Sequence, residues 1–159
     1  MRHRKQTRSI TVRITKNFDS LNVNASKLKK LVKTVCNHFK LLKADVSIAL
    51  VDDAEIRKIN KEFLNQDSCT DVISFDLSDD DVKSPKSFEL VVNAEMAARE
   101  AGLRGHSGQA ELALYVTHGL LHNLGFDDAK VVDAKKMHDT EDEILQELGF
   151  GLVYNKGSV

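Results

Sequence analysis

The sequence lacks several features that would assign it to common protein classes. Its two cysteines, Cys36 and Cys69, form no spaced framework, which favours two thiols in a reducing compartment over a disulfide and argues against a cysteine metal site. No apolar run reaches the ~18 residues needed to span a bilayer, and no signal-peptide core follows the start. These absences predict a cytoplasmic protein that does not bind a membrane.

The sequence also lacks an excess of charge of one sign. Its 23 basic and 24 acidic side chains give a net charge of −1, so no overall basic field concentrates RNA or DNA, and nucleic-acid binding requires a local patch. The basic segment 1–8 could contact phosphates as an arm, but we interpret it as a flexible, solvated terminus. The length of 159 residues predicts one domain spanning residues 1–159.

The hydrophobic pattern predicts an α+β fold. Alternating apolar residues indicate half-buried strands, and apolar residues at spacings of three and four indicate amphipathic helices. The acidic segment 76–87 holds the only proline and separates two strands that are close enough to pair as an antiparallel hairpin. We therefore expect a small mixed β-sheet of about four strands, packed with helices, one of which is central and buried.

The boundaries of the expected elements follow from these patterns and from capping residues. The strands are expected at 9–15, 45–51, 71–75 and 88–93. The helices are expected from Ser26 to Leu42, from an Asp52 or Asp53 cap with Ile56, Ile59 and Phe63 as its buried face, over 94–101 with Gly102 as its end, over 109–124, and over 129–148 with Gly149 as its end. Arg104 and His106 are expected in a flexible loop over 103–108.

The segment 117–129 carries the clearest chemical signal. His118 and His122 are four residues apart, so on a helix both imidazoles project from one face, as two nitrogen ligands of one divalent metal require. Gly125 can adopt the left-handed conformation that ends a helix and turns the chain back, which brings Asp128 towards the same ion. We therefore predict an open metal site formed by His118, His122 and Asp128, with a fourth position for water or substrate.

Two alternatives to this interpretation come from the same residues. A histidine pair at helical spacing also occurs on buried helices where each ring bonds only a carbonyl group, but the glycine and the acid that follow favour a metal. Metzincin proteases share the ligand spacing and carry a glutamate after the first histidine as general base. Here that residue is Gly119, which cannot move a proton and argues against peptide hydrolysis.

The motif predicts a metal site but does not by itself determine which metal binds or which residue is the catalytic base. A carboxylate ligand lowers the net charge of a zinc site, so Asp128 also admits manganese or iron. Glu111 lies two helical turns before His118 and is the candidate catalytic base, although it could instead orient a ligand or be a surface acid. We interpret His138 as an exposed helix residue, although its imidazole is the one that could compensate for an unusual ligand set.

The segment 118–128 resembles the signature of the YbeY-type endoribonucleases, the bacterial ribosomal RNA maturation factors. Other matches follow in order over about residues 45–150. They are Ile59-Asn60 with Phe63, the strand from Thr70 to Phe75, Leu90-Val91-Val92, Glu111-Leu112-Ala113-Leu114, Ile144-Leu145, and Leu148-Gly149-Phe150.

The resemblance implies a small cytoplasmic α+β hydrolase with one zinc ion per chain, held by His118, His122 and Asp128. Its implied activity is that of a single-strand-specific metallo-endoribonuclease. The implied role is ribosomal RNA processing, including maturation of the small-subunit 3′ end, and ribosome quality control. The implied partners are ribosomal RNA, the small ribosomal subunit and ribosome-assembly factors, including a GTPase.

Three positions depart from the pattern of this family. The third ligand is usually histidine and here is Asp128, and Phe88-Glu89 replaces a Gly-Asp pair. Leu64 replaces an arginine, which could clamp a phosphate as leucine cannot. Two alternatives therefore stay open, namely a metalloprotease or other metallohydrolase, and a ribosome-assembly factor with little catalytic activity.

Overall fold

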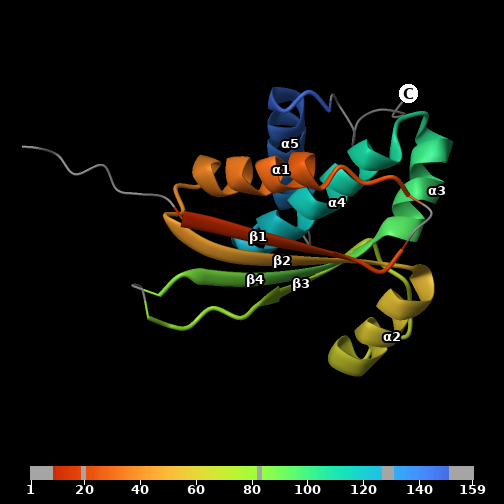
Figure 1. The fold of residues 1–159 in the computed structure, drawn as a ribbon, viewed down its shortest axis with the longest axis horizontal. Coiled ribbons are helices and arrows are strands. Elements are labelled where there is room, and N and C mark those ends of the chain that lie inside the picture. Colours follow the sequence, from red (N-terminus) through yellow and green to blue (C-terminus); the bar gives the residue numbers. More distant parts are fainter. Residues whose placement is uncertain (1–8, 19–20, 82–83, 127–130, 151–159) are drawn as a thin grey trace, which may run out of the picture.

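A mixed β-sheet forms the centre of the molecule (Figure 1). The computed structural model describes residues 9–18, 21–81, 84–126 and 131–150 of the chain, and of 131 and 132 only the backbone. The sheet has four strands in the order β1-β2-β4-β3. β1 and β2 are parallel, as are β2 and β4, whereas β3 and β4 are antiparallel. The strands are β1 (Ser9–Lys16), β2 (Lys43–Val51), β3 (Val72–Asp76) and β4 (Lys86–Asn93).

Helices cover both faces of the sheet. Figure 1 shows α1, α3, α4 and α5 on one side of the sheet and α2 on the other. Alternate residues of each strand serve the two faces, so Val46 and Leu50 of β2 enter the large core while Val51 joins Ile56 of α2 in a smaller one. The α+β prediction with a mixed sheet is confirmed. The helices are α1 (Ala25–His38), α2 (Asp53–Leu64), α3 (Ala94–Arg104), α4 (Gly108–Asn123) and α5 (Val131–Glu147).

α4 is the central buried helix that the sequence predicts, and it lies close to β3 at Gly119. The Ser74 hydroxyl donates a hydrogen bond of 2.9 Å to the Gly119 carbonyl oxygen. A Cβ atom on Gly119 would lie only 2.9 Å from Cγ2 of Val72 and 3.0 Å from Oγ of Ser74. The absence of a side chain at Gly119 is therefore a packing requirement, since it lets α4 approach the sheet.

In two of the predicted helices, the last residue assigned to the buried face is not buried. α1 stops at His38 because Lys40 has a positive φ of 58° and the chain leaves the helix, so Leu42 lies outside it and is 38% exposed. On α2, Ile56 is buried as predicted, but Phe63 is 63% exposed. Its ring lies edge-on to Phe75 at a centroid distance of 5.8 Å, at the margin of the smaller core.

The predicted end of α3 is also wrong. The helix continues through Gly102 to Arg104 and ends at Gly105, whose φ of 72° is left-handed. The Ser107 side chain then accepts a hydrogen bond from the Ala110 N–H and caps α4, so the connection between the helices is shorter than predicted. Arg104 consequently lies in α3 and not in the predicted loop, whereas His106 lies in the short connection with its side chain only 6% exposed.

The last helix ends within one residue of its predicted end, and Gly149, with a φ of 83°, follows two residues beyond its last residue, Glu147. Its predicted first residues and the basic segment 1–8 lie outside the described residues. Neither cysteine forms a disulfide: Cys36 is buried, which raises its pKa to about 11, and Cys69 is exposed. No helix in the described part of the chain is long and apolar enough to cross a membrane.

The close approach at Gly119 predicts a stability difference between two helical glycines. Gly119→Ala forces β3 or its side chains to move, and we expect it to lower the free energy of unfolding by about 1–3 kcal/mol. A Cβ atom on Gly102 would have no atom within 4 Å, so Gly102→Ala is the matched control. We expect that control to be neutral or slightly stabilising because alanine is the better helix former. Urea unfolding of both variants measures this, and equal losses of stability would contradict the packing role.

The first residue of α2 predicts a pH dependence of stability. Arg99 and Asn93 donate hydrogen bonds of 3.0 Å and 2.7 Å to the Asp53 carboxylate, and they lower its pKa from 3.8 to about 2. Because the pKa of Asp53 is lower in the folded state than in the unfolded state, the ionised side chain stabilises the fold at pH values above the unfolded-state pKa. This contribution disappears as the pH falls towards 2. We expect the wild type to exceed Asp53→Asn in stability at about pH 6 and the difference to shrink at about pH 2.5. Urea midpoints at both pH values test this, and a constant difference would refute it.

Candidate metal centre

His118 and His122 converge at the end of α4. Their Nε2 atoms are 3.0 Å apart, and the ring planes are inclined by 80°. Two nitrogens bound at ~2.0–2.1 Å to one tetrahedral zinc ion are about 3.3 Å apart. The observed separation therefore fits a shared ion after a small outward shift of either ring.

The other nitrogen of each ring is held by an oxygen atom. Nδ1 of His118 donates to Oε1 of Glu141 at 2.8 Å, and Nδ1 of His122 donates to the Phe126 carbonyl oxygen at 3.1 Å. Because a carboxylate and a carbonyl only accept, each neutral ring carries its proton on Nδ1 and directs the Nε2 lone pair at the other ring. Two lone pairs at this distance repel unless they share a cation, and this tautomer is the one that metal-binding histidines need.

The turn after α4 creates the contact to His122. Gly125 has a φ of 98°, the left-handed conformation expected from the sequence. The Phe126 N–H then donates to the Leu121 carbonyl oxygen at 3.0 Å, which directs the Phe126 carbonyl oxygen back towards His122. Asp128 lies outside the described residues, and among the described residues no group of three His, Cys, Asp or Glu side chains forms a metal site. The set of three ligands therefore stays a prediction.

Glu141 of α5 is a residue of this site that the sequence analysis did not identify. Its side chain is fully buried, and its second oxygen, Oε2, accepts a hydrogen bond of 3.2 Å from Nδ1 of His138. The signal was present, since Glu141 shares the apolar face of α5 with Met137, Ile144 and Leu145, all fully buried. A carboxylate on such a face requires polar partners inside the protein.

The prediction that His138 is exposed is wrong. Its side chain is 19% exposed, and its ring stacks on that of His118 with 6.3 Å between the centroids and 16° between the planes. α5 packs its apolar face on α4, which places the neighbouring position 138 beside the histidine pair. A cavity of about 100 Å³ lies here, large enough to hold water. It is lined by Asp71, Arg104, Leu114, Tyr115, His118, His138 and Glu141.

Glu111, the predicted catalytic base, lies in the first turn of α4 and is fully buried. Its Oε2 contacts Nε2 of His106, and its Oε1 lies 3.3 Å from Nη1 of Arg104, an ion pair without hydrogen-bond geometry. Burial raises the pKa of Tyr115, and the negative charge of Glu111 adds to this effect. These contacts hold the acid between α3 and α4, and neither partner is a predicted metal ligand. The two roles considered for Glu111, as catalytic base or as a group that orients a ligand, therefore stay predictions.

A cleft of about 370 Å³ opens beside His122. It follows β3 on one side and the end of α2 on the other, and Leu64, the residue found where the resemblance expects arginine, lies in its wall. All of its lining side chains other than His122 are uncharged, so it can supply hydrogen bonds and apolar contacts but no lysine or arginine charge. They are Asn60, Leu64, Gln66, Ser68, Cys69, Thr70, Val72, Ile73 and Ser74.

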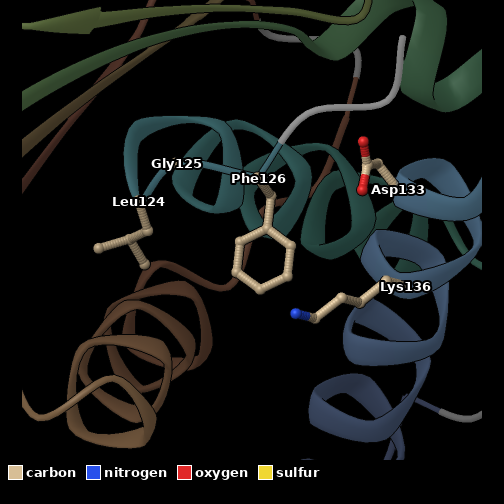
Figure 2. A pocket seen from close by; sticks show the side chains of 5 residues that line it. All are labelled: Leu124, Gly125, Phe126, Asp133 and Lys136. Atoms are coloured by element: carbon tan, nitrogen blue, oxygen red, sulfur yellow. The ribbon is translucent and has the colours of Figure 1, made fainter. Parts of the chain in front are cut away.

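A second pocket, of about 250 Å³, lies between the end of α4 and α5 (Figure 2). The ring of Phe126 and the side chain of Lys136 point towards each other across it, with Nζ 6.0 Å from the ring centroid. Asp133 lies above Lys136 in the same wall. An aromatic ring and a cation thus lie next to the turn that holds His122. They line this second pocket and not the uncharged cleft.

Comparisons with known proteins agree with this architecture. A family model described as Endoribonuclease YbeY matches residues 13–149. The chain is 40% identical over 106 residues to the Endoribonuclease YbeY of an Anaeromyxobacter species, which covers 67% of this chain and 55% of that protein. It is 42% identical over 98 residues to that of Ureaplasma parvum, which covers 62% of this chain and 63% of that protein. The chain thus spans less than two thirds of the length of these relatives.

A solved structure supports the fold independently. The solution structure of TM1509 from Thermotoga maritima superposes with a TM-score of 0.56 at 24% identity and covers 86% of this chain and 91% of that one. At this identity the likeness concerns the fold alone. The family match extends over both histidines, Glu141 and the whole sheet except the first residues of β1. The chain therefore belongs to the Endoribonuclease YbeY family.

Proposed function

We propose that the protein is a metal-dependent endoribonuclease that cleaves single-stranded RNA during ribosomal RNA processing. The family match and the names of the relatives support a nuclease that acts on RNA. The observation that carries the proposal is the pair of Nε2 atoms 3.0 Å apart, with both Nδ1 atoms held by oxygen acceptors. That arrangement prepares two ligands for one cation before the cation binds.

In this proposal, different residues of the chain have different roles. His118, His122 and Asp128 would hold the ion, which is zinc or another divalent metal. When bound, such an ion supplies a Lewis acid and activates water for attack on phosphorus. Glu141 orients His118, and the Phe126 carbonyl oxygen orients His122, so that both ligands need only a small shift to share an ion.

The two pockets that flank the centre suit a single strand better than a duplex. A base of an unpaired strand can stack on Phe126 while Lys136 contacts a phosphate, and the polar side chains of the cleft can bond a second nucleoside. Within the proposal, the substrate is ribosomal RNA, including the 3′ end of the small-subunit RNA, and the role extends to ribosome biogenesis and quality control in the cytoplasm. The partners are the small ribosomal subunit and its assembly factors.

Specific observations bear on two other candidate functions. Peptide hydrolysis with the usual base is disfavoured, because a side chain at position 119 would meet β3 instead of reaching the histidines. A ribosome-assembly factor with little hydrolysis is favoured by one feature, Leu64 in an uncharged cleft that offers no arginine for a phosphate.

The first experiment compares substrates. We expect the zinc-loaded protein to cut a labelled single-stranded RNA, to leave the same sequence intact in a duplex, and to leave casein intact. Replacing both His118 and His122 with alanine, or removing the metal with a chelator, should abolish cleavage because the ion loses its site. His38→Ala removes an exposed histidine of α1 and is the matched control.

Three outcomes would reject the nuclease proposal. One is cleavage of casein without cleavage of RNA. Another is RNA cleavage that survives loss of both histidines. The third is an inactive protein that still restores ribosome maturation in cells when both histidines are replaced, which would establish the assembly role instead.

The second experiment tests Glu141 through metal affinity. Glu141→Gln keeps one acceptor but turns an amide N–H towards the N–H of either His118 or His138, so the ring loses its fixed orientation. We expect zinc to bind about 10–100-fold more weakly in competition with a chelating dye. Asp139→Asn is the control, because Asp139 is exposed on the same helix and pairs only weakly with Lys135 at 3.6 Å. Unchanged zinc affinity in Glu141→Gln would contradict the orienting role.

A further inference from the structure

β3 is an edge strand of the sheet, with β4 on one side only (Figure 1). The Asn93 N–H donates to the Asp71 carbonyl oxygen and the Leu77 N–H to the Ser87 carbonyl oxygen, both at 2.8 Å. In the register that pairs Val72 with Val92, each of these bonds joins residues that lie directly opposite each other. Such bonded pairs alternate along an antiparallel ladder. The residues at 73 and 75 therefore face β4, and the backbone groups of Val72, Ser74 and Asp76 point to the outer edge.

This outer edge keeps its hydrogen-bonding capacity. The Val72 N–H is taken by the side chain of Asp71 at 2.8 Å. Within the described part of the chain, the outward N–H groups of Ser74 and Asp76 donate to no other protein group. Natural proteins usually cover or blunt such an edge. Here Val72 and Ser74 line the cleft of about 370 Å³ beside His122, so there is open space next to the strand.

The pattern of groups on the edge selects the kind of occupant. Outward residues recur every second position, about 6.8 Å apart, and each offers one donor and one acceptor. An extended polypeptide presents the same alternation and can add to the sheet as another strand. A ribose-phosphate chain presents mainly acceptors, and no lysine or arginine lines the cleft to hold its phosphates.

The negative charge beyond the end of β3 indicates which charge a bound polypeptide segment would carry. Asp76, Asp79, Asp80 and Asp81 are exposed along the continuation of the strand. Asp76 is ionised at neutral pH like an ordinary aspartate, and hydrogen bonds from Ser78 lower its pKa further. Leu77, between them, is 58% exposed and can contact an apolar side chain. The acidic continuation favours a segment that carries positive charge.

We propose that the open edge of β3 binds an extended, basic polypeptide segment of a partner protein, which pairs with Val72, Ser74 and Asp76 as a fifth strand. The segment lies along the cleft that reaches His122, so its binding places a partner at the mouth of the histidine pair. The docking proposal does not require nuclease activity, because strand pairing depends on the sheet edge and the acidic continuation. A bound segment would occupy the cleft that the proposed RNA strand also uses, so the two would compete there.

The test uses a capped ten-residue peptide of alternating lysine and valine as the probe. We expect it to shift the amide resonances of Ser74 and Asp76 in nitrogen–proton spectra and to slow their hydrogen exchange, as new backbone bonds would. The charge-matched control is the same peptide with every amide N-methylated, which we expect to bind at least about tenfold more weakly since it cannot donate. A peptide of alternating glutamate and valine should not bind.

Protein variants test the same contact from the other side. Asp76→Pro removes an outward N–H at an edge position where proline is tolerated, and Asp76→Ala removes the same carboxylate but keeps the N–H. We expect the proline variant to bind the probe about 3–10-fold more weakly than the alanine variant. If the proline variant does not fold, the combined Asp79→Asn and Asp80→Asn variant replaces it. That variant should weaken binding and reduce its dependence on salt.

Several results would overturn the proposal. Equal affinity for the methylated and unmethylated probes would exclude strand pairing. Resonance shifts confined to other surfaces, or no binding at millimolar peptide, would exclude the site. Shifts of Ser74 and Asp76 with a ten-residue uridine oligonucleotide, but not with the peptide, would identify RNA as the occupant of this edge.

Discussion

The close contact between α4 and β3 determines where the histidine pair can be. Gly119 has no side chain, and its carbonyl oxygen accepts from Ser74, so this side of α4 lies against the sheet. His118 and His122 are one residue before and three residues after this contact, which rotates both away from it on the same flank of the helix. That flank meets α5, and Glu141 is the residue of α5 that bonds His118. One glycine thus sets the distance of the helix from the sheet and, through it, the position of the candidate metal centre.

Much of the fold was predictable because its signals are local. Alternation located the strands within two residues at either end, and amphipathic spacing, apolar composition and capping residues located the helices that the structure describes. The errors arose where neighbours in space decide the outcome. Gly102 and Gly105 are equally able to end α3, and only the Ser107 cap of the next helix makes the later one the end. Phe63 has the spacing of a buried residue, but the small core beneath α2 ends before it.

In the candidate site, too, local spacing was informative, whereas contacts between segments far apart in the sequence could not be predicted. The histidine pair and the Gly125 turn follow from spacing within one helix and its end, and the structure brings them together. Glu141 is more than twenty residues further along the chain, so no local pattern links it to His118. Glu111 was the acid that spacing suggested, yet α4 carries it at its opposite end, against Arg104 and His106. Helical spacing identifies residues on one face, but it cannot tell which neighbouring helix supplies the partner.

The two buried glutamates differ in how their charge is balanced, and this difference bears on the metal. Glu111 has the guanidinium of Arg104 3.3 Å away. Glu141 receives N–H bonds from two histidines, which are neutral donors when each ring carries a single proton, on Nδ1. A fully buried carboxylate with neutral donors alone is costly, because little water screens it. A divalent cation on the far nitrogen of His118 would polarise the shared N–H and offset this charge through the ring. In the proposed centre, the carboxylate that orients the ligand and the ion that the ligand holds therefore stabilise each other, and metal binding becomes linked to the stability of the α4–α5 contact.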